Sequence, residues 1–150
     1  IHAARGALMA LVGKAVEPVR LALAPDLATP GAYRPDAEDA GKRALKNTLL
    51  ILGVAAGLKQ ARADCLTEFE TAKNMNDRFA AFQRIVHLHG QKAAAGAIAT
   101  FEEWYHGDPL IMDKWFSVIA SAPGPKAVAT VRPSRIATTS LSAFRPATAR

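Results

Sequence analysis

The sequence contains a single cysteine and no long apolar run among its 150 residues. Cys65 cannot form a disulfide within the chain, which fits a reducing compartment such as the cytoplasm. No apolar stretch reaches the roughly 18 residues that cross a bilayer. Residues 49–58 are too short, and Lys46 and Lys59 flank them. The first residues also lack the apolar core and the cleavage site of a secretory signal. We therefore expect a cytoplasmic protein that does not insert into a membrane.

Acidic residues are absent from positions 126–150, and this absence explains the net charge of +6. Residues 1–125 carry 14 basic and 13 acidic groups, whereas residues 126–150 carry five basic groups. The body thus has no basic stripe of the kind that neutralises nucleic-acid phosphates. Phe144 is the one aromatic residue among the arginines of the tail, although single-strand binders interleave several. We expect no nucleic-acid partner, and a basic-tailed nucleic-acid binder stays an alternative.

The common catalytic motifs are missing as well. The sequence has no glycine-rich phosphate loop and no H-E-x-x-H, which would place two zinc-binding histidines and a glutamate base on one helix. His87 and His89 are two residues apart, so on one helix they point to different sides. Cys65 lies on an apolar helical stripe, where a free cysteine usually packs as a small hydrophobe. We expect no catalytic residue, no metal ligand and no cofactor in this chain.

Apolar residues recur at helical spacing in five or six segments, and no segment shows the alternation of a strand. The first helix is expected over about residues 2–23, and Pro18 should kink or split it. One face of this helix carries Leu8, Leu11, Ala15, Val19 and Ala22. The second helix should bury a stripe of Leu45, Leu49, Leu52 and Ala56. Between them, residues 24–35 contain three prolines and are expected to form a loop.

Capping residues mark where the expected helices begin. Asp36 is the predicted N-cap of the second helix. Asn74 opens a capping box in which Asp77 occupies the position of the usual glutamate. Asp108 caps the last helix, with Pro109 at its first position, where the missing N–H costs nothing. Glycines are expected to end or separate the helices at Gly57, Gly90 and Gly107.

The order of these elements predicts an all-α fold. From about residue 36 to residue 122, helices joined by short turns favour antiparallel pairs stacked into an armadillo-like or HEAT-like superhelix. We therefore expect one helical-repeat domain over residues 1–125. Residues 126–150 form a basic tail rich in Ser, Thr, Pro and Ala, which we expect to be divergent or disordered.

Three motifs stand in order along the chain: D-A-E-D-A-G-K-R-A-L-K-N at 36–47, A-K-N-M-N-D-R at 72–78 and D-P-L-I-M-D-K-W-F at 108–116. They are similar to the patterns D-x-x-x-x-G-(K/R)-R-A-L-(R/K)-N, A-x-N-M-T-D-R and D-P-L-V-M-D-K-W-F. The chain thereby resembles the carboxy-terminal helical domain of bacterial aminopeptidase N, an alanyl aminopeptidase among the gluzincin zinc metallopeptidases. The resemblance covers roughly residues 1–132 and implies a fragment of that domain.

The resemblance implies a role rather than a reaction. In that family the helical domain closes over the catalytic domain, walls an internal chamber and restricts access to short peptides. A zinc site elsewhere in the parent chain releases the N-terminal residue. The implied partners are the catalytic domain of the same parent chain and peptide substrates, and the zinc belongs to the parent enzyme. The tail departs from the family pattern, so only Arg135 could correspond to the N-P-N-R arginine that faces the substrate channel.

Two further hypotheses follow from the residues and the resemblance. We expect the fragment alone to be inactive as a peptidase, because its sequence lacks the zinc motif of the parent enzyme. The alternative to a chamber wall is a free-standing helical-repeat module that binds a partner protein on its concave face.

Overall fold

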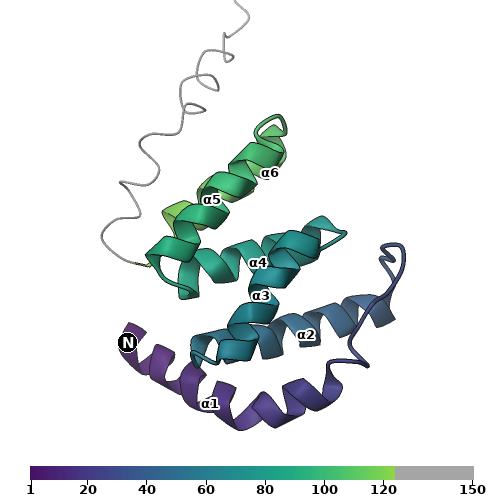
Figure 1. The fold of residues 1–150 in the computed structure, drawn as a ribbon, viewed down its shortest axis with the longest axis vertical. Helices are drawn as coiled ribbons and strands as arrows, with labels where there is room; N and C mark the ends of the chain where they lie inside the picture. Colours follow the sequence, from purple (N-terminus) through teal and green to yellow (C-terminus); the bar gives the residue numbers. More distant parts are fainter. Residues whose placement is uncertain (124–150) are drawn as a thin grey trace, which may run out of the picture. The chain divides into compact units, whose positions relative to one another are not determined.

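The computed structural model describes residues 1–123, which form six α-helices and contain no strand (Figure 1). The all-α prediction is confirmed, whereas the expected basic tail of residues 126–150 lies outside the described residues. The helices are α1 (His2–Leu23), α2 (Ala37–Ala55), α3 (Lys59–Thr71), α4 (Met75–Leu88), α5 (Gln91–Tyr105) and α6 (Pro109–Ala120).

The chain divides into two compact units, Ile1–Ala97 and Ile98–Arg150. The first unit holds α1 to α4 and the start of α5, and α2 is its central helix because it contacts α1, α3 and α4. Figure 1 shows α1 and α2 side by side and antiparallel, and α3 pairs with α4. This unit therefore has the stacked helix pairs that the sequence predicts.

The helix α1 continues through Pro18, so of the two outcomes expected at this residue, a kink or a split, the split does not occur. Figure 1 shows instead that α1 bends along its length. A proline lacks the N–H that would bond one turn back, and helices commonly bend where that bond is missing.

The contact between α1 and α2 brings two backbones together at Gly13. A Cβ built on Gly13 would lie 2.1 Å from the carbonyl oxygen of Leu52 and 2.9 Å from the Cβ of Ala56. Only a residue without a side chain fits such an approach. Gly13 is buried, and it fixes how closely α1 lies on α2.

The apolar face of α1 that the sequence singled out points away from α2. Leu8 is 62% exposed, Leu11 67% and Val19 50%, and Ala15 and Ala22 of the same face are exposed too. The opposite face of the helix, with Gly13 and Arg20, is the buried one. Met9, Val16 and Leu23 are half-buried and lie at helical spacing on that same side, so α1 has apolar residues on both sides, which is typical of a helix that lies between two layers.

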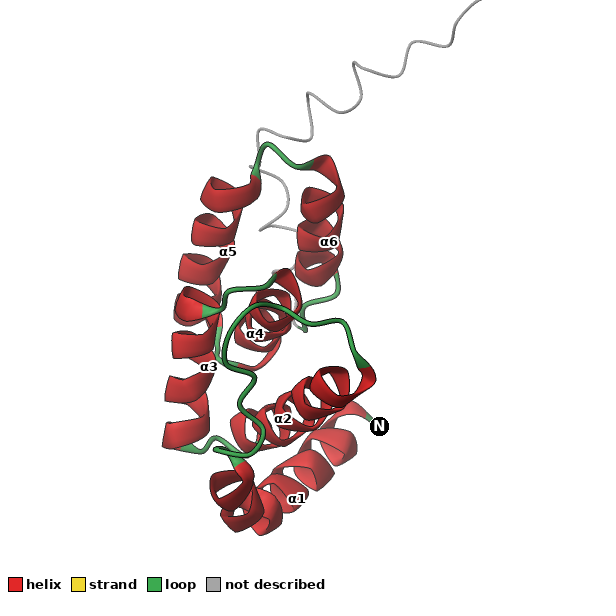
Figure 2. Ribbon diagram, turned by 90° about the vertical axis from the view of Figure 1, so that its right-hand side faces the viewer, coloured by secondary structure: helices red, strands yellow, loops and turns green. Residues whose placement is uncertain are grey.

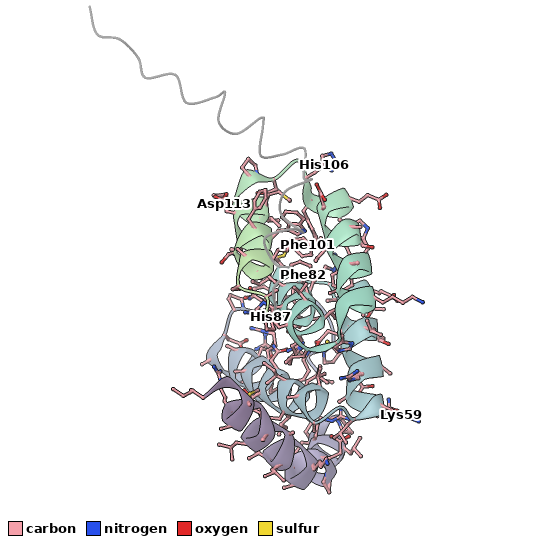
Figure 3. The ribbon with its side chains drawn as sticks, turned by 90° about the vertical axis from the view of Figure 1, so that its left-hand side faces the viewer. Lys59, Phe82, His87, Phe101, His106 and Asp113 are labelled. Carbon is pink, nitrogen blue, oxygen red and sulfur yellow. The ribbon has the colours of Figure 1, made fainter. Side chains whose placement is uncertain are left out.

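The core of the first unit lies where α2, α3 and α4 meet. Phe82 of α4 is fully buried and stacks on Phe69 of α3, with 6.2 Å between the ring centroids. Figure 3 shows Phe82 among the helices, whereas Lys59 extends outward from the start of α3. The fully buried core also contains Val54, Ala61, Cys65, Ala81 and Ile85.

The buried stripe of α2 differs from the predicted one by a rotation of the helix. Leu49 is buried as expected, but Leu45 is 44% exposed, and the buried stripe continues through Leu50, Gly53 and Val54. Because α2 has neighbours on several sides, its buried surface is wider than the single stripe that period counting assumes.

The predicted helix starts and ends are confirmed. Side chains of Asp36, Asn74 and Asp108 accept hydrogen bonds from backbone N–H groups in the first turns of α2, α4 and α6. Gly57 and Gly90 have positive φ angles of 73° and 90° directly after the ends of α2 and α4. Left-handed glycines of this kind end helices without a Cβ clash.

In the second unit, Trp115 ties α6 to the last turns of α5. Trp115 is almost fully buried, and its indole Nε1 donates to the carbonyl oxygen of Ile98 at 3.1 Å. Phe101 is fully buried and packs on Tyr105 with 4.7 Å between the ring centroids. Trp104, in contrast, is 44% exposed.

The close approach of α1 and α2 gives a matched pair of glycine substitutions. We expect Gly13→Ala to lower the free energy of unfolding by about 2 kcal/mol, because the new methyl group overlaps the backbone of α2. Gly6→Ala meets nothing within 4 Å and should raise it by about 1 kcal/mol through helix propensity. Urea denaturation measures both values. Equal effects of the two substitutions would contradict the close contact.

Candidate functional site

A cavity of about 540 Å³ opens in the first unit, bounded by the end of α1, the loop that follows it, α2, α3 and the start of α4. Figure 2 shows the loop between α1 and α2 in green, running past the other helices of this unit. The apolar part of the lining includes Leu27, Leu49 and Leu50, all three buried. Its charged part consists of the cations Arg20, Arg43, Lys46 and Lys73 and the acids Asp39, Asp64, Glu68 and Asp77.

The loop wall is fixed through Tyr33. Its hydroxyl accepts a hydrogen bond from the side-chain amide of Asn76 at 2.9 Å, and its ring lies 4.7 Å from the guanidinium carbon of Arg43. Arg43 also donates to the carbonyl oxygen of Arg34 at 3.0 Å. A loop rich in proline and glycine is thereby fastened to two helices, α2 and α4.

Arg20 lies at one side of the cavity, and all three nitrogens of its guanidinium donate to carboxylates. Its Nε and one Nη donate to Glu17, and the other Nη donates to Asp64, all at 2.7 Å. These hydrogen bonds, those to Glu17 first, raise the pKa of Arg20 further above its ordinary value in spite of its burial. The pair with Asp64 joins α1 to α3.

A network of charges at another side of the cavity joins α2, α3 and α4. Glu68 of α3 contacts Lys46 of α2 at 2.6 Å and Arg84 of α4 at 2.8 Å. Arg84 is 4% exposed and also donates to the side-chain oxygen of Asn47 at 2.8 Å. Lys46 lies 3.5 Å from Asp77, which is 5% exposed. The two buried charges of this network, Arg84 and Asp77, therefore each have a partner of opposite sign.

The polar residues of the first two sequence motifs meet in this network. Lys46 and Asn47 end the first motif, and Asn74 and Asp77 belong to the second. The Asn74 side chain accepts from the backbone N–H of Asp77 and donates its amide to the Asp77 carboxylate, both at 2.9 Å. The capping box is thus reciprocal, but its return bond comes from the asparagine side chain rather than from its backbone.

Arg78 of the second motif closes the end of α3. Its Nε donates to the carbonyl oxygen of Phe69 at 3.2 Å, and an Nη donates to that of Ala72. The last carbonyl groups of a helix have no partners within it, and an arginine there also favours the negative end of the helix dipole. The described side chains of this motif therefore hold helix ends together.

The buried thiol of Cys65 is poorly suited to nucleophilic chemistry. Cys65 is fully buried, and its Sγ lies 3.7 Å from the carbonyl oxygen of Ala81. Burial raises the pKa of this thiol, so the reactive thiolate is disfavoured. The prediction that Cys65 packs as a small hydrophobe agrees with this position.

The residues that sequence reasoning considered for chemistry do not come together. Arg135, the residue that could correspond to a substrate-channel arginine, lies outside the described residues. Within residues 1–123 no three His, Cys, Asp or Glu side chains are grouped so as to hold a metal ion. Within the same residues no helix is both long and apolar enough to cross a membrane.

Sequence reasoning assigned no function to the residues of the cavity. The sequence holds one weak indication of these residues, since Arg20 and Arg43 are charged residues at buried positions of their helices. A charge on a buried face predicts a partner on another helix. It does not tell which partner or where the two meet.

The family profile of a domain of unknown function with ARM repeats, DUF3458_C, matches residues 1–146. The chain belongs to this family. ARM repeats are pairs or triplets of stacked helices, which agrees with the arrangement in the first unit. The charged network and the caps described above are therefore features of one ARM-repeat domain.

Two relatives of this ARM-repeat domain carry the name aminopeptidase N. The protein of Caulobacter vibrioides is 30% identical over 131 residues, which cover 87% of this chain and 15% of the relative. That of Escherichia coli is 31% identical over 100 residues, covering 67% of this chain and 11% of the relative. The resemblance to the carboxy-terminal domain of aminopeptidase N is confirmed, and the chain spans only a small part of the length of these relatives.

The buried network gives a second testable prediction. Glu68→Gln should lower the free energy of unfolding by about 3 kcal/mol, because Arg84 would lose its one carboxylate partner among the described residues while staying buried. Glu38→Gln is the control, since Glu38 pairs with Lys42 at the surface, where water screens the pair and its loss should have little effect. Losses of similar size, measured by chemical denaturation, would contradict the role of the network.

His89 gives a prediction about pH. Burial, and then the charges of Arg62 and Arg84, lower the pKa of His89 below its ordinary value of about 6.5. As the pH falls, the unfolded chain therefore binds the proton first. Neutral His89 therefore contributes fully to the stability of the folded chain above about pH 6.5. This contribution to the free energy of unfolding is lost as the pH falls toward the lower pKa that His89 has in the folded chain.

His89→Gln should remove this part of the pH dependence. The free energy of unfolding at about pH 7.5 and about pH 5.5 should differ less in this variant than in the unaltered chain. His106→Gln is the control, because His106 is exposed in the turn after α5. If the free energy of unfolding changed with pH by the same amount in His89→Gln and in the unaltered chain, the assignment of this pH dependence to His89 would be wrong.

Proposed function

We propose that this domain is a non-catalytic part of an aminopeptidase that releases N-terminal residues from peptides, and that it walls and gates the substrate chamber. The ARM-repeat family and the two relatives named aminopeptidase N support this proposal. In it, zinc and peptide hydrolysis belong to the remainder of the parent polypeptide, and no chemical step is assigned to the residues of this chain. The cytoplasmic location expected from the sequence is part of the same proposal.

The observation that carries the proposal is the outer face of α1. Leu8, Leu11 and Val19 are all at least half exposed on the side of α1 that faces away from α2. A stripe of this kind, on a helix whose other side is already buried, is typical of a surface that another layer covers. We assign this surface to the contact with the catalytic part of the parent chain.

The packing within the first unit suits a wall. Its helices are tied by partly buried ion pairs between α1 and α3 and among α2, α3 and α4. Such cross-links hold the helices in one register and oppose bending of the layer. A rigid layer can exclude large substrates from a chamber, whereas a mobile one would admit them.

A chimera tests the proposed function. In the aminopeptidase N of Caulobacter vibrioides, the segment that aligns with this chain is replaced by the sequence of this chain. We expect the chimera to hydrolyse alanyl-p-nitroanilide and to keep the preference of the parent for short over long peptides. A chimera carrying Leu8→Ser and Leu11→Ser should lose activity or size preference, because its covering contact is weakened.

One further variant serves as a control, and two results would contradict the proposal. Leu66→Ser serves as the control, since Leu66 is also exposed but lies on α3 rather than on the outer face of α1. An enzyme that lacks the segment, stays folded and keeps the same preference for short peptides would rule out the wall. If instead the chimera were active but insensitive to Leu8→Ser and Leu11→Ser, the contact through α1 would be wrong.

A further inference from the structure

The charges that line the cavity of the first unit are not balanced locally, although they include four cations and four acids. All four acids have a cation within 4.0 Å, the longest of these contacts being that of Asp39 with Arg34. Two of the four cations, Arg20 and Lys46, have acids within the same distance. The remaining two are Arg43 and Lys73. Arg43 and Lys73 are therefore the two cations of the lining that have no carboxylate within 4.0 Å among the described residues.

Arg43 differs from Arg20 in how its guanidinium is used. All three nitrogens of Arg20 donate to carboxylate oxygens at 2.7 Å. Arg43 is just as buried, with 6% of its surface exposed, and yet no carboxylate among the described residues lies within 4.0 Å of it. Its one hydrogen bond in that part of the chain goes to the carbonyl oxygen of Arg34. The other nitrogens of Arg43 are not among the buried polar atoms that lack a partner, so they remain accessible and can donate to an anion.

The orientation of Arg43 leaves an edge for such an anion. The guanidinium carbon lies 4.7 Å from the centre of the Tyr33 ring, and one Nη donates to the carbonyl oxygen of Arg34. The five N–H groups of arginine lie in one plane, so the groups not used by Arg34 remain along the edge. Arg43 lines the cavity, and such an edge binds a carboxylate through two parallel hydrogen bonds.

The rest of the cavity lining indicates which kind of group is attached to the carboxylate of the ligand. Leu27, Leu49 and Leu50 provide a buried apolar surface in the same cavity. The volume of about 540 Å³ lies within the range of about 300–1,000 Å³ that is usual for small-molecule sites. We propose that this cavity binds a small carboxylate with an aliphatic body, whose carboxylate pairs with Arg43 and whose aliphatic part contacts the leucines.

Lys73 has a secondary role in this site. It lines the cavity from the segment between α3 and α4, but it is exposed. Its charge is therefore screened by water and contributes less to binding than that of Arg43. The proposal concerns only residues of the first unit and does not depend on the proposed function in an aminopeptidase.

Binding is tested on the 150-residue chain with N-acetylleucine and N-acetylleucinamide, which differ in the carboxylate alone. Titrations followed by amide chemical shifts should show saturable changes at residues of the cavity lining for the acid. The amide should bind at least about tenfold more weakly, because it cannot form the charge-assisted pair with Arg43. An acetylated tetrapeptide ending in leucine distinguishes the two sources of the same chemistry, a free acid and the carboxy terminus of a peptide.

Substitutions locate the site. Arg43→Gln should weaken binding of the acid by about tenfold, Lys73→Gln by about twofold, and Lys42→Gln not at all, since Lys42 is on α2 outside the lining. Circular dichroism checks that Arg43→Gln is folded. The comparison of acid with amide uses the unaltered chain, so it decides the proposal even if this variant does not fold. Equal affinity for acid and amide, shift changes away from the cavity, or no saturable change would each overturn the proposal.

Discussion

The carboxylate of Glu68 holds the first unit together, because it pairs at once with Lys46 of α2 and Arg84 of α4. Three helices thereby meet at a single side chain that is 14% exposed. Without Glu68, Arg84 would be buried with no carboxylate partner among the described residues, and Asn47 and Asp77 satisfy much of what remains of the network. A polar network of this kind favours one register of the helices, since sliding any helix by a turn would separate several charges at once.

The sequence predicts the elements well, because the signals for them are local. A cap such as Asp36 or Asn74 acts on the N–H groups of the next turn, so its position in the sequence is enough to place a helix start. The same holds for Gly57, whose left-handed conformation ends α2. The orientation of the helices is less predictable: α1 has apolar residues on both sides, and period counting cannot tell which side packs on α2.

The cavity could not be predicted because it depends on distances across the fold. Arg43 and Tyr33 are ten positions apart, and Arg20 and Asp64 are 44 apart, so their contacts exist only once α1, α2 and α3 are packed. The sequence motifs do point to this region, but the described side chains of the first two serve largely as caps, ion pairs and helix closures. A motif shared with a family of enzymes can therefore preserve a scaffold rather than a reaction.

The central claim is that Glu68 and Arg84 stabilise the fold as a pair, and a double-mutant cycle tests it most directly. The free energy of unfolding is measured for the unaltered chain, Glu68→Gln, Arg84→Met and the double variant. The account predicts that the two losses are not additive, with a coupling of at least about 1 kcal/mol in favour of the pair. Additive losses would show that each side chain acts alone, and would contradict the network as the feature that holds α2, α3 and α4 in register.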